Sequence, residues 1–249
     1  MYGKPEISHN DGWNAGGLSI EVEKPTEVVH TRFEGSVLVM ADPRDMQDPS
    51  RAFKENPRQS LMLNLRHDAV GPFYGHVGDP DDDNQFARAH TEQHMRVSGE
   101  LKIGDEPRAA FSGHGLRDHS WGPRYWQAAR SYRWITGNFG DDLGMVVNTN
   151  GEGEGGGLFH EGEEIVRIAK AKVETDYEPG TRFHRALRAQ LSLEDGRERV
   201  LEGRVMGFIP LRNRRAGSNT HIGEGMTQYT LDGERVGYGL SEYLDQPEE

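Results

Sequence analysis

The sequence predicts an all-β fold of antiparallel strands with very little helix, and three observations predict it. Apolar and polar residues alternate in many short segments, which is the pattern of strands with one buried face. Glycine is frequent, with 32 residues in 249, and it recurs along the chain at intervals that suit turns between strands. Turn signals such as Asp195-Gly196 and Asp232-Gly233 separate several of these segments.

Each predicted strand has one apolar and one polar face. The predicted strands cover residues 18–23, 33–40, 60–67, 95–103, 131–138, 143–148, 164–173, 186–193, 199–208, 225–231 and 235–243. The glycine-rich segment 151–156 carries two glutamates that would repel the phosphates of a dinucleotide, so we interpret it as the tip of a hairpin. One stretch, 48–55, has helix signals: Asp48 suits the capping position, Pro49 suits the first turn, and Pro57 ends the segment.

A domain boundary is predicted at residues 78–84, because this acidic segment contains no apolar side chain. The prediction is a shorter N-terminal β domain over residues 1–84 and a C-terminal β domain over residues 85–249. The aspartates in 78–84 are spaced like the start of a calcium loop, but Asn84 stands where such a loop needs glycine. His90 stands where the bidentate glutamate belongs, so we interpret the segment as a linker.

The composition disfavours several classes of protein. The chain carries 41 acidic and 29 basic side chains, and the resulting net charge of -12 repels the phosphates of nucleic acids. The basic cluster at 212–215 follows Pro210, and we interpret it as a solvated loop. The lack of cysteine excludes disulfides, cysteine-ligated zinc, iron–sulfur clusters and thiol nucleophiles. We therefore expect no nucleic-acid partner, no cofactor and no metal.

The sequence also suggests where the protein works. Its apolar runs, such as residues 36–41, are far shorter than the ~20 residues of a membrane-spanning helix, so an integral membrane protein is not expected. No apolar stretch follows Lys4, so the pattern of a secretory signal is missing and we expect a cytoplasmic protein. A short N-terminal domain leaves edge strands to cover, and a second copy of the chain would cover them in a homodimer.

The densest concentration of chemically capable side chains lies between Gly113 and Trp126. Asp118 and His119 supply a carboxyl group and an imidazole, either of which burial can tune into a general acid or base. Aromatic faces that stabilise cations, and arginines that can lie over them or pair with the aspartate, surround this pair: Arg117, Trp121, Arg124, Tyr125 and Trp126. A structural interpretation, with the tryptophans in a core and an arginine bound to Asp118, stays open at this point.

A second cluster lies at His90, Glu92 and His94, which strand geometry places on one face. This order of residues differs from the known zinc motifs, so we expect these side chains to line a pocket rather than to hold a metal. Further candidates for a cavity wall are His221, Glu224 and the terminal strand 237–243, which contains Tyr238.

From 117 to 126 the sequence reads Arg-Asp-His-Ser-Trp-Gly-Pro-Arg-Tyr-Trp. This stretch resembles the superfamily of carotenoid 1,2-hydratases and related two-domain lipocalin-like proteins, whose hallmark is Asp-His-x-Trp-Gly, and it is most similar to bacterial members of unassigned function. Stretches at 92–99 and 237–244 extend the resemblance, which covers residues 86–244. The resemblance implies two lipocalin-like domains, each a β-barrel or curved sheet, with an apolar substrate between or inside them. It also implies that Asp118 protonates an alkene and that His119 is its partner.

We therefore expect a cofactor-independent hydratase or dehydratase, a lyase that acts on an apolar terpenoid-like or aromatic molecule. Asp118 would deliver the proton, and a water held by His119 or His94 would add to the cation. The expected substrate-binding residues are Arg117, Trp121, Arg124, Tyr125, Trp126, His90, Glu92 and Tyr238. Two alternatives stay open: a cyclase or isomerase with the same first step, and a non-catalytic carrier of an apolar ligand.

Overall fold

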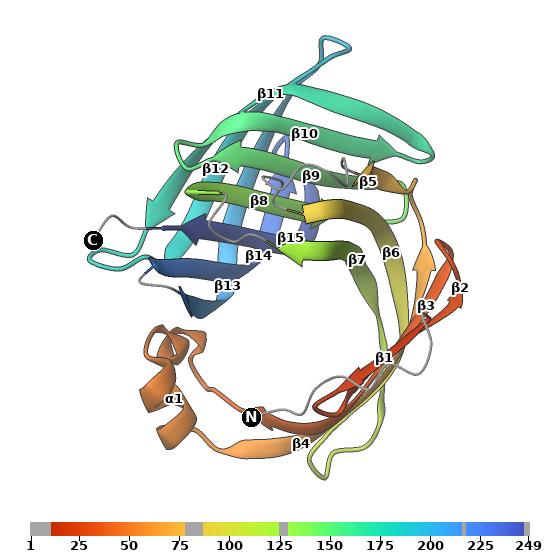
Figure 1. Ribbon diagram of the computed structural model, residues 1–249, viewed down its shortest axis with the longest axis vertical. Coiled ribbons are helices and arrows are strands. Elements are labelled where there is room, and N and C mark those ends of the chain that lie inside the picture. The colour runs from red at the N-terminus through yellow and green to blue at the C-terminus, as the bar shows by residue number, and fades with distance from the viewer. Residues whose placement is uncertain (1–10, 78–86, 125–128, 216–217, 247–249) are drawn as a thin grey trace.

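The computed structural model describes residues 11–77, 87–124, 129–215 and 218–246, and these residues form a curved sheet beside a closed barrel (Figure 1). The strands of the sheet are β1 (Gly12–Ala15), β2 (Leu18–Lys24), β3 (Val28–Leu38), β4 (Arg58–Ala69), β5 (Tyr74–Val77), β6 (Ala87–Ile103) and β7 (Ala109–Arg124). The strands of the barrel are β8 (Ser131–Asn138), β9 (Leu143–Asn150), β10 (Glu154–Glu161), β11 (Glu164–Tyr177), β12 (His184–Leu193), β13 (Glu198–Arg215), β14 (Ser218–Leu231) and β15 (Arg235–Asp245). The predicted all-β fold of barrel and curved sheet is confirmed.

The curved sheet is antiparallel, and within the described residues β1, β5 and β7 each pair with one neighbour only. The long strand β6 pairs with β7 along one side, so β4 and the short β5 share its other side. Curvature lets a sheet of this kind wrap around a hollow face without closing into a barrel.

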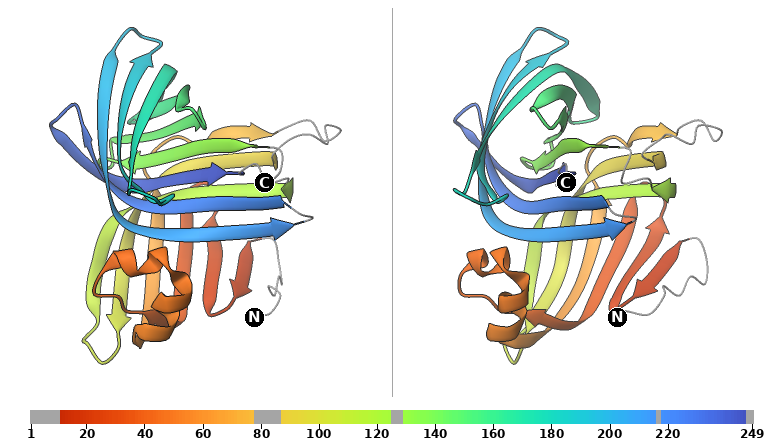
Figure 2. Two further views of the ribbon diagram at one scale, coloured as in Figure 1. Left: turned by 90° about the vertical axis from the view of Figure 1, so that its left-hand side faces the viewer. Right: turned by 60° about the vertical axis from the view of Figure 1, so that its left-hand side comes forward.

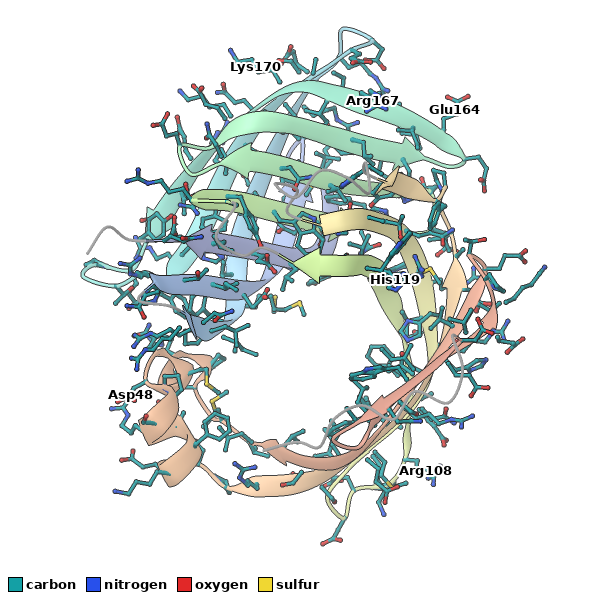
Figure 3. The ribbon with its side chains drawn as sticks, viewed as in Figure 1. Asp48, Arg108, His119, Glu164, Arg167 and Lys170 are labelled. Atoms are coloured by element: carbon teal, nitrogen blue, oxygen red, sulfur yellow. The ribbon has the colours of Figure 1, made fainter. Side chains whose placement is uncertain are left out.

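The barrel closes because β15 returns to pair with β8, and every other neighbour in the barrel follows in chain order. Its interior is filled by apolar side chains, among them Ile135, Met145, Phe159, Leu191 and Tyr229. Charged side chains of β11 point away from this core, as Arg167 and Lys170 do in Figure 3. The interior of the barrel is therefore a packed apolar core in the described part of the chain.

The predicted helix is confirmed as α1 (Pro49–Glu55), and the Asp48 carboxylate accepts a hydrogen bond from the backbone N–H of Arg51 at 3.1 Å. A 3-10 helix, η1 (Pro43–Gln47), precedes it. Figure 2 shows this helical segment below the long strands β13 and β14 and beside the curved sheet. The Gln47 amide donates to Glu178 at 3.1 Å, so the segment links the two units. No helix in the described part of the chain is long and apolar enough to cross a membrane.

Two predictions about organisation differ from the structure. The strands on either side of the acidic segment 78–84, β5 and β6, pair with each other in one sheet. The chain passes from sheet to barrel between β7 and β8 instead, so the 85–249 domain is divided between both units. The basic cluster 212–215 belongs to β13 and is not a loop, because β14 pairs with it along its length. The acidic segment itself lies outside the described residues.

Candidate functional site

The two faces of β6 have different surroundings. His90, Glu92 and His94 share one face, as the alternation predicts, and that face lies against the outer wall of the barrel. Arg96 continues the same row and forms an ion pair with Asp141 of the barrel at 2.8 Å. The other face carries buried side chains such as Met95 and turns toward the hollow side of the curved sheet.

On the barrel-facing side, an imidazole and two carboxyl groups lie together. The Nε2 atom of His90 is 2.6 Å from Oδ1 of Asp118 and 4.0 Å from Oε1 of Glu92. The indole N–H of Trp134, on β8, donates to the same Glu92 oxygen at 2.7 Å. This cluster therefore joins sheet and barrel, and Trp134 is a member of it that the sequence analysis missed.

The two carboxyl groups of the cluster have different environments. The Glu92 side chain is only 8% exposed, whereas the Asp118 side chain is 42% exposed. Burial raises the pKa of Glu92 and the charge of Asp118 raises it further, while His90 and the Trp134 hydrogen bond act in the opposite direction. The buried carboxyl group of the cluster, whose environment favours the protonated acid, is therefore that of Glu92.

The predicted partnership of Asp118 with His119 is wrong, because successive residues of β7 point to opposite faces of the sheet. Asp118 pairs with His90 on the barrel side. His119 lies beside Arg117 on the hollow side, where Nη2 of Arg117 is 3.3 Å from Nδ1 of His119. The ion pair between Arg117 and Asp118, which the structural interpretation expected, is not formed either. Figure 3 shows His119 where β7 bends from the sheet toward the barrel.

A pocket of about 510 Å³ lies on the hollow side of the sheet. Most of its wall is apolar and comes from Trp13, Leu18, Ile20, Val22, Val29, Met95 and Leu116. The polar part of its lining includes His67, Arg117 and His119, and Asp118 borders the pocket although its carboxyl group pairs with His90 on the barrel side. Trp13 belongs to β1 and Arg117 to β7, so the curvature brings both edges of the sheet to one pocket. An apolar wall with a few polar groups is the usual composition of a small-molecule site.

A larger hollow, of about 920 Å³, lies further along the same sheet. Its lining includes paired charged side chains such as Arg108 and Glu100, and none of the residues of the 117–121 motif contributes to it. The smaller pocket is therefore the better candidate, since it combines apolar walls with the chemically capable residues.

His94 lies outside this pocket. Its ring is fully buried and contacts the ring of His160 on β10, with 4.7 Å between the centroids. Burial, followed by the proximity of His160, lowers the pKa of His94 to about 3. The expectation that His94 holds a catalytic water at the substrate is therefore corrected: it is a neutral residue of the contact between sheet and barrel.

The other predicted site residues do not lie together in one site. Trp121 is 46% exposed and packs against the ring of His119 at 5.4 Å, so it is not a core residue. Tyr238 is 50% exposed on the barrel surface and its hydroxyl accepts a hydrogen bond from Gln228. Tyr125, Trp126 and the side chain of Arg124 lie outside the described residues.

A second carboxyl pair stands on the barrel. Glu224 of β14 lies opposite Glu242 of β15, and burial, then the charge of Glu242 and their hydrogen bond, raises the pKa of Glu224 to about 8. The hydroxyl of Tyr132 donates to Glu242. The sequence analysis named Glu224 and the segment 237–243 that contains Glu242, and period-two alternation in both strands is the signal that each side chain faces outward.

The fold defines the protein as a barrel-and-sheet protein with a pocket on the sheet. The chain matches the model of a family described as a domain of unknown function, DUF7064, over residues 2–247, and it belongs to that family. No curated protein matches the chain. Within the described ranges, no group of three or more histidine, aspartate or glutamate side chains is placed to hold a metal ion.

Proposed function

We propose that the protein binds an apolar small molecule in the pocket on the hollow side of the curved sheet. The observation that carries the proposal is an apolar wall built from both edges of the sheet, with exposed or half-buried apolar side chains such as Ile20 and Trp13. Covering apolar surface gains about 25 cal/mol for each Å² that is removed from water. Part of this gain is offset by the cost of association, and a micromolar dissociation constant needs a net gain of about 8 kcal/mol, so the ligand must bury its own apolar surface as well.

The test is titration with the neutral fluorescent probe N-phenyl-1-naphthylamine. Ile20→Glu should weaken binding at least tenfold, because it places a charge in the apolar wall. Ile103→Glu is the matched control, since Ile103 has the same 38% exposure on the same sheet but does not line the pocket. Absence of binding by the unchanged protein, or equal losses in both variants, would overturn the proposal.

A second candidate is a cofactor-independent lyase of the hydratase type, and the Asp118–His90 pair at 2.6 Å beside the pocket favours it. In this candidate Asp118 in its protonated form gives a proton to an alkene, and water adds to the resulting carbocation and returns a proton to the pair. A cyclase or isomerase would share the protonation and exclude the water. The resemblance of residues 117–126 to the carotenoid hydratases supports the same class.

The lyase candidate is tested by incubating a host lipid and metabolite extract in oxygen-18 water with the unchanged protein and with Asp118→Asn. A compound that gains one labelled water only with the unchanged protein supports the lyase and identifies its substrate. A compound converted at the same rate by both proteins would contradict the role of Asp118. Recovery of a bound compound unchanged would favour the carrier.

Two further expectations stay predictions. β1 and β7 are edge strands of the curved sheet in the described part of the chain, as is the short β5, and a second copy covering such edges would give a homodimer. Light scattering at micromolar concentration tests this assembly, and a monomer would contradict it. Cell fractionation tests the expected cytoplasmic location.

A further inference from the structure

Arg117 is a half-buried cation, and the polar groups within reach of its side chain in the described residues carry no charge. Its Nη1 is 3.4 Å from the hydroxyl of Thr91, its Nη2 is 3.3 Å from Nδ1 of His119, and its guanidinium lies 5.8 Å from the centre of the Phe73 ring. Within the described residues it forms no ion pair with a carboxylate, and Asp118 attracts it only at longer range. Arg96, on the opposite side of the same strand pair, has Asp141 as its counterion at 2.8 Å.

Burial of this guanidinium carries a cost that no ion pair offsets within the described residues. Desolvation lowers the pKa of Arg117, and the charge of Asp118 acts in the opposite direction. Arginine stays charged in proteins, so the buried side chain stabilises any anion that reaches it. A carboxylate is the best fit in shape, because its two oxygens match the two N–H groups on one edge of a guanidinium.

His119 adds a donor next to this cation. Arginine can only donate hydrogen bonds, so Nδ1 of His119 is the acceptor in their contact and the proton of the neutral ring is on Nε2. Partial burial, followed by the charge of Arg117, lowers the pKa of His119, which keeps the ring neutral at pH 7. An anion bound to Arg117 could therefore accept a second hydrogen bond from this imidazole.

A second polar group in the pocket wall lacks a partner. Nε2 of His67, on β4, is buried and makes no hydrogen bond within the described residues. Burial, followed by the charge of His30, lowers the pKa of His67, so this imidazole is neutral too. A hydroxyl or carbonyl group of a ligand would satisfy Nε2, and the apolar wall between His67 and Arg117 would take the body of the molecule.

We infer that the ligand of this pocket is an apolar molecule with a carboxylate group, whose carboxylate binds Arg117 and His119 while its apolar body covers Met95 and the β2–β3 wall. The inference rests on the proposed binding function and names the chemical class of its ligand. The net charge of -12 repels anions at long range, so the affinity for the carboxylate depends on direct contact with Arg117.

The test compares 11-(dansylamino)undecanoic acid with its methyl ester, which differ in charge but share the same apolar body. Fluorescence titration should show at least tenfold tighter binding of the acid than of the ester. Arg117→Gln should reduce the affinity for the acid to that for the ester and leave the ester unchanged. Arg96→Gln, on the barrel side, is the control and should leave both affinities unchanged.

The outcomes separate this inference from the function on which it rests. Equal binding of acid and ester would overturn the carboxylate assignment and leave the apolar pocket standing. Failure of both probes to bind would overturn the binding function itself. An acid preference that survives Arg117→Gln would contradict the role of Arg117, provided that near-ultraviolet circular dichroism shows an unchanged fold.

Discussion

The imidazole rings of His94 and His160 lie 4.7 Å apart between their centroids, one on the sheet and the other on the barrel. Both rings are fully buried, and neither Nε2 atom has a hydrogen-bond partner within the described residues. Gly144 of β9 lies against both Nε2 atoms. Two neutral imidazoles in close contact thus form part of the joint between the units, and a proton on either one would be a buried charge.

Gly144→Ala is expected to destabilise this joint. The added Cβ would lie 2.5 Å from Nε2 of His160 and 2.6 Å from Nε2 of His94, so the rings or the strand must move. Overpacking of this kind costs about 1–3 kcal/mol in the free energy of unfolding. Urea unfolding measures it, with Gly207→Ala as the control because nothing lies within 4 Å of that added Cβ. Equal stability of the two variants would contradict the close approach.

The stability of the protein should fall in mild acid because of its buried histidines. The pKa is lowered by burial to about 3 for His94 and to about 4 for His184, both from 6.5. Above pH 6.5 these residues are neutral in the folded and unfolded chain alike. Below it the unfolded chain binds protons that the folded chain does not, so stability decreases by up to about 1.4 kcal/mol per pH unit for each histidine, down to about pH 4 for His184 and about pH 3 for His94.

The variant His94→Gln isolates one of these contributions. The difference in unfolding free energy between this variant and the unchanged protein should shift in favour of the variant between pH 6.5 and 5. His76→Gln is the control at an exposed position. A difference that stays constant with pH would show that His94 titrates normally.

The change in the free energy of unfolding caused by Glu224→Gln is expected to be more favourable at alkaline pH than at pH 6. The raised pKa of about 8 means that the folded chain keeps a proton which the unfolded chain loses above pH 4.5, so stability is lost as the pH rises toward and through 8. The amide does not ionise, so the variant should gain at least about 1 kcal/mol on going from pH 6 to pH 9, after allowance for solvent screening. Urea unfolding at both pH values measures it, and Glu174→Gln, at an exposed position, is the control. The same change in both variants would contradict the shared proton of Glu224 and Glu242.

Glu92→Ala and Glu92→Gln should differ because of the Trp134 indole. Alanine removes the acceptor of the 2.7 Å hydrogen bond, and leaving that N–H without a partner costs about 1–3 kcal/mol. Glutamine retains an oxygen at the same place and should cost less than about 1 kcal/mol. Chemical unfolding, followed by tryptophan emission, compares the two. Similar losses would mean that the hydrogen bond does not stabilise the contact between sheet and barrel.

Local patterns in the sequence determined the strands and the faces of their side chains. The segment 131–138 was predicted with the bounds of β8, and the common face of His90, Glu92 and His94 is confirmed. Strands rich in glycine or lacking clear alternation were missed, namely β1, β5, β7 and β10. Alternation and turn signals depend on neighbouring residues alone, which is why they can be recognised without a structure.

Only the tertiary structure decided which strands pair and which side chains meet. The acidic composition of 78–84 indicated a break in the strands, but whether flanking strands pair across such a break depends on the whole sheet. The partner of Asp118 also depends on strand pairing, because Asp118 is adjacent to His119 in sequence but contacts His90 on the neighbouring strand. The pocket between Trp13 and Arg117 exists because the sheet curves until its two edges border one hollow. Curvature and pairing arise from packing between residues far apart in the chain, and no local pattern carries that information.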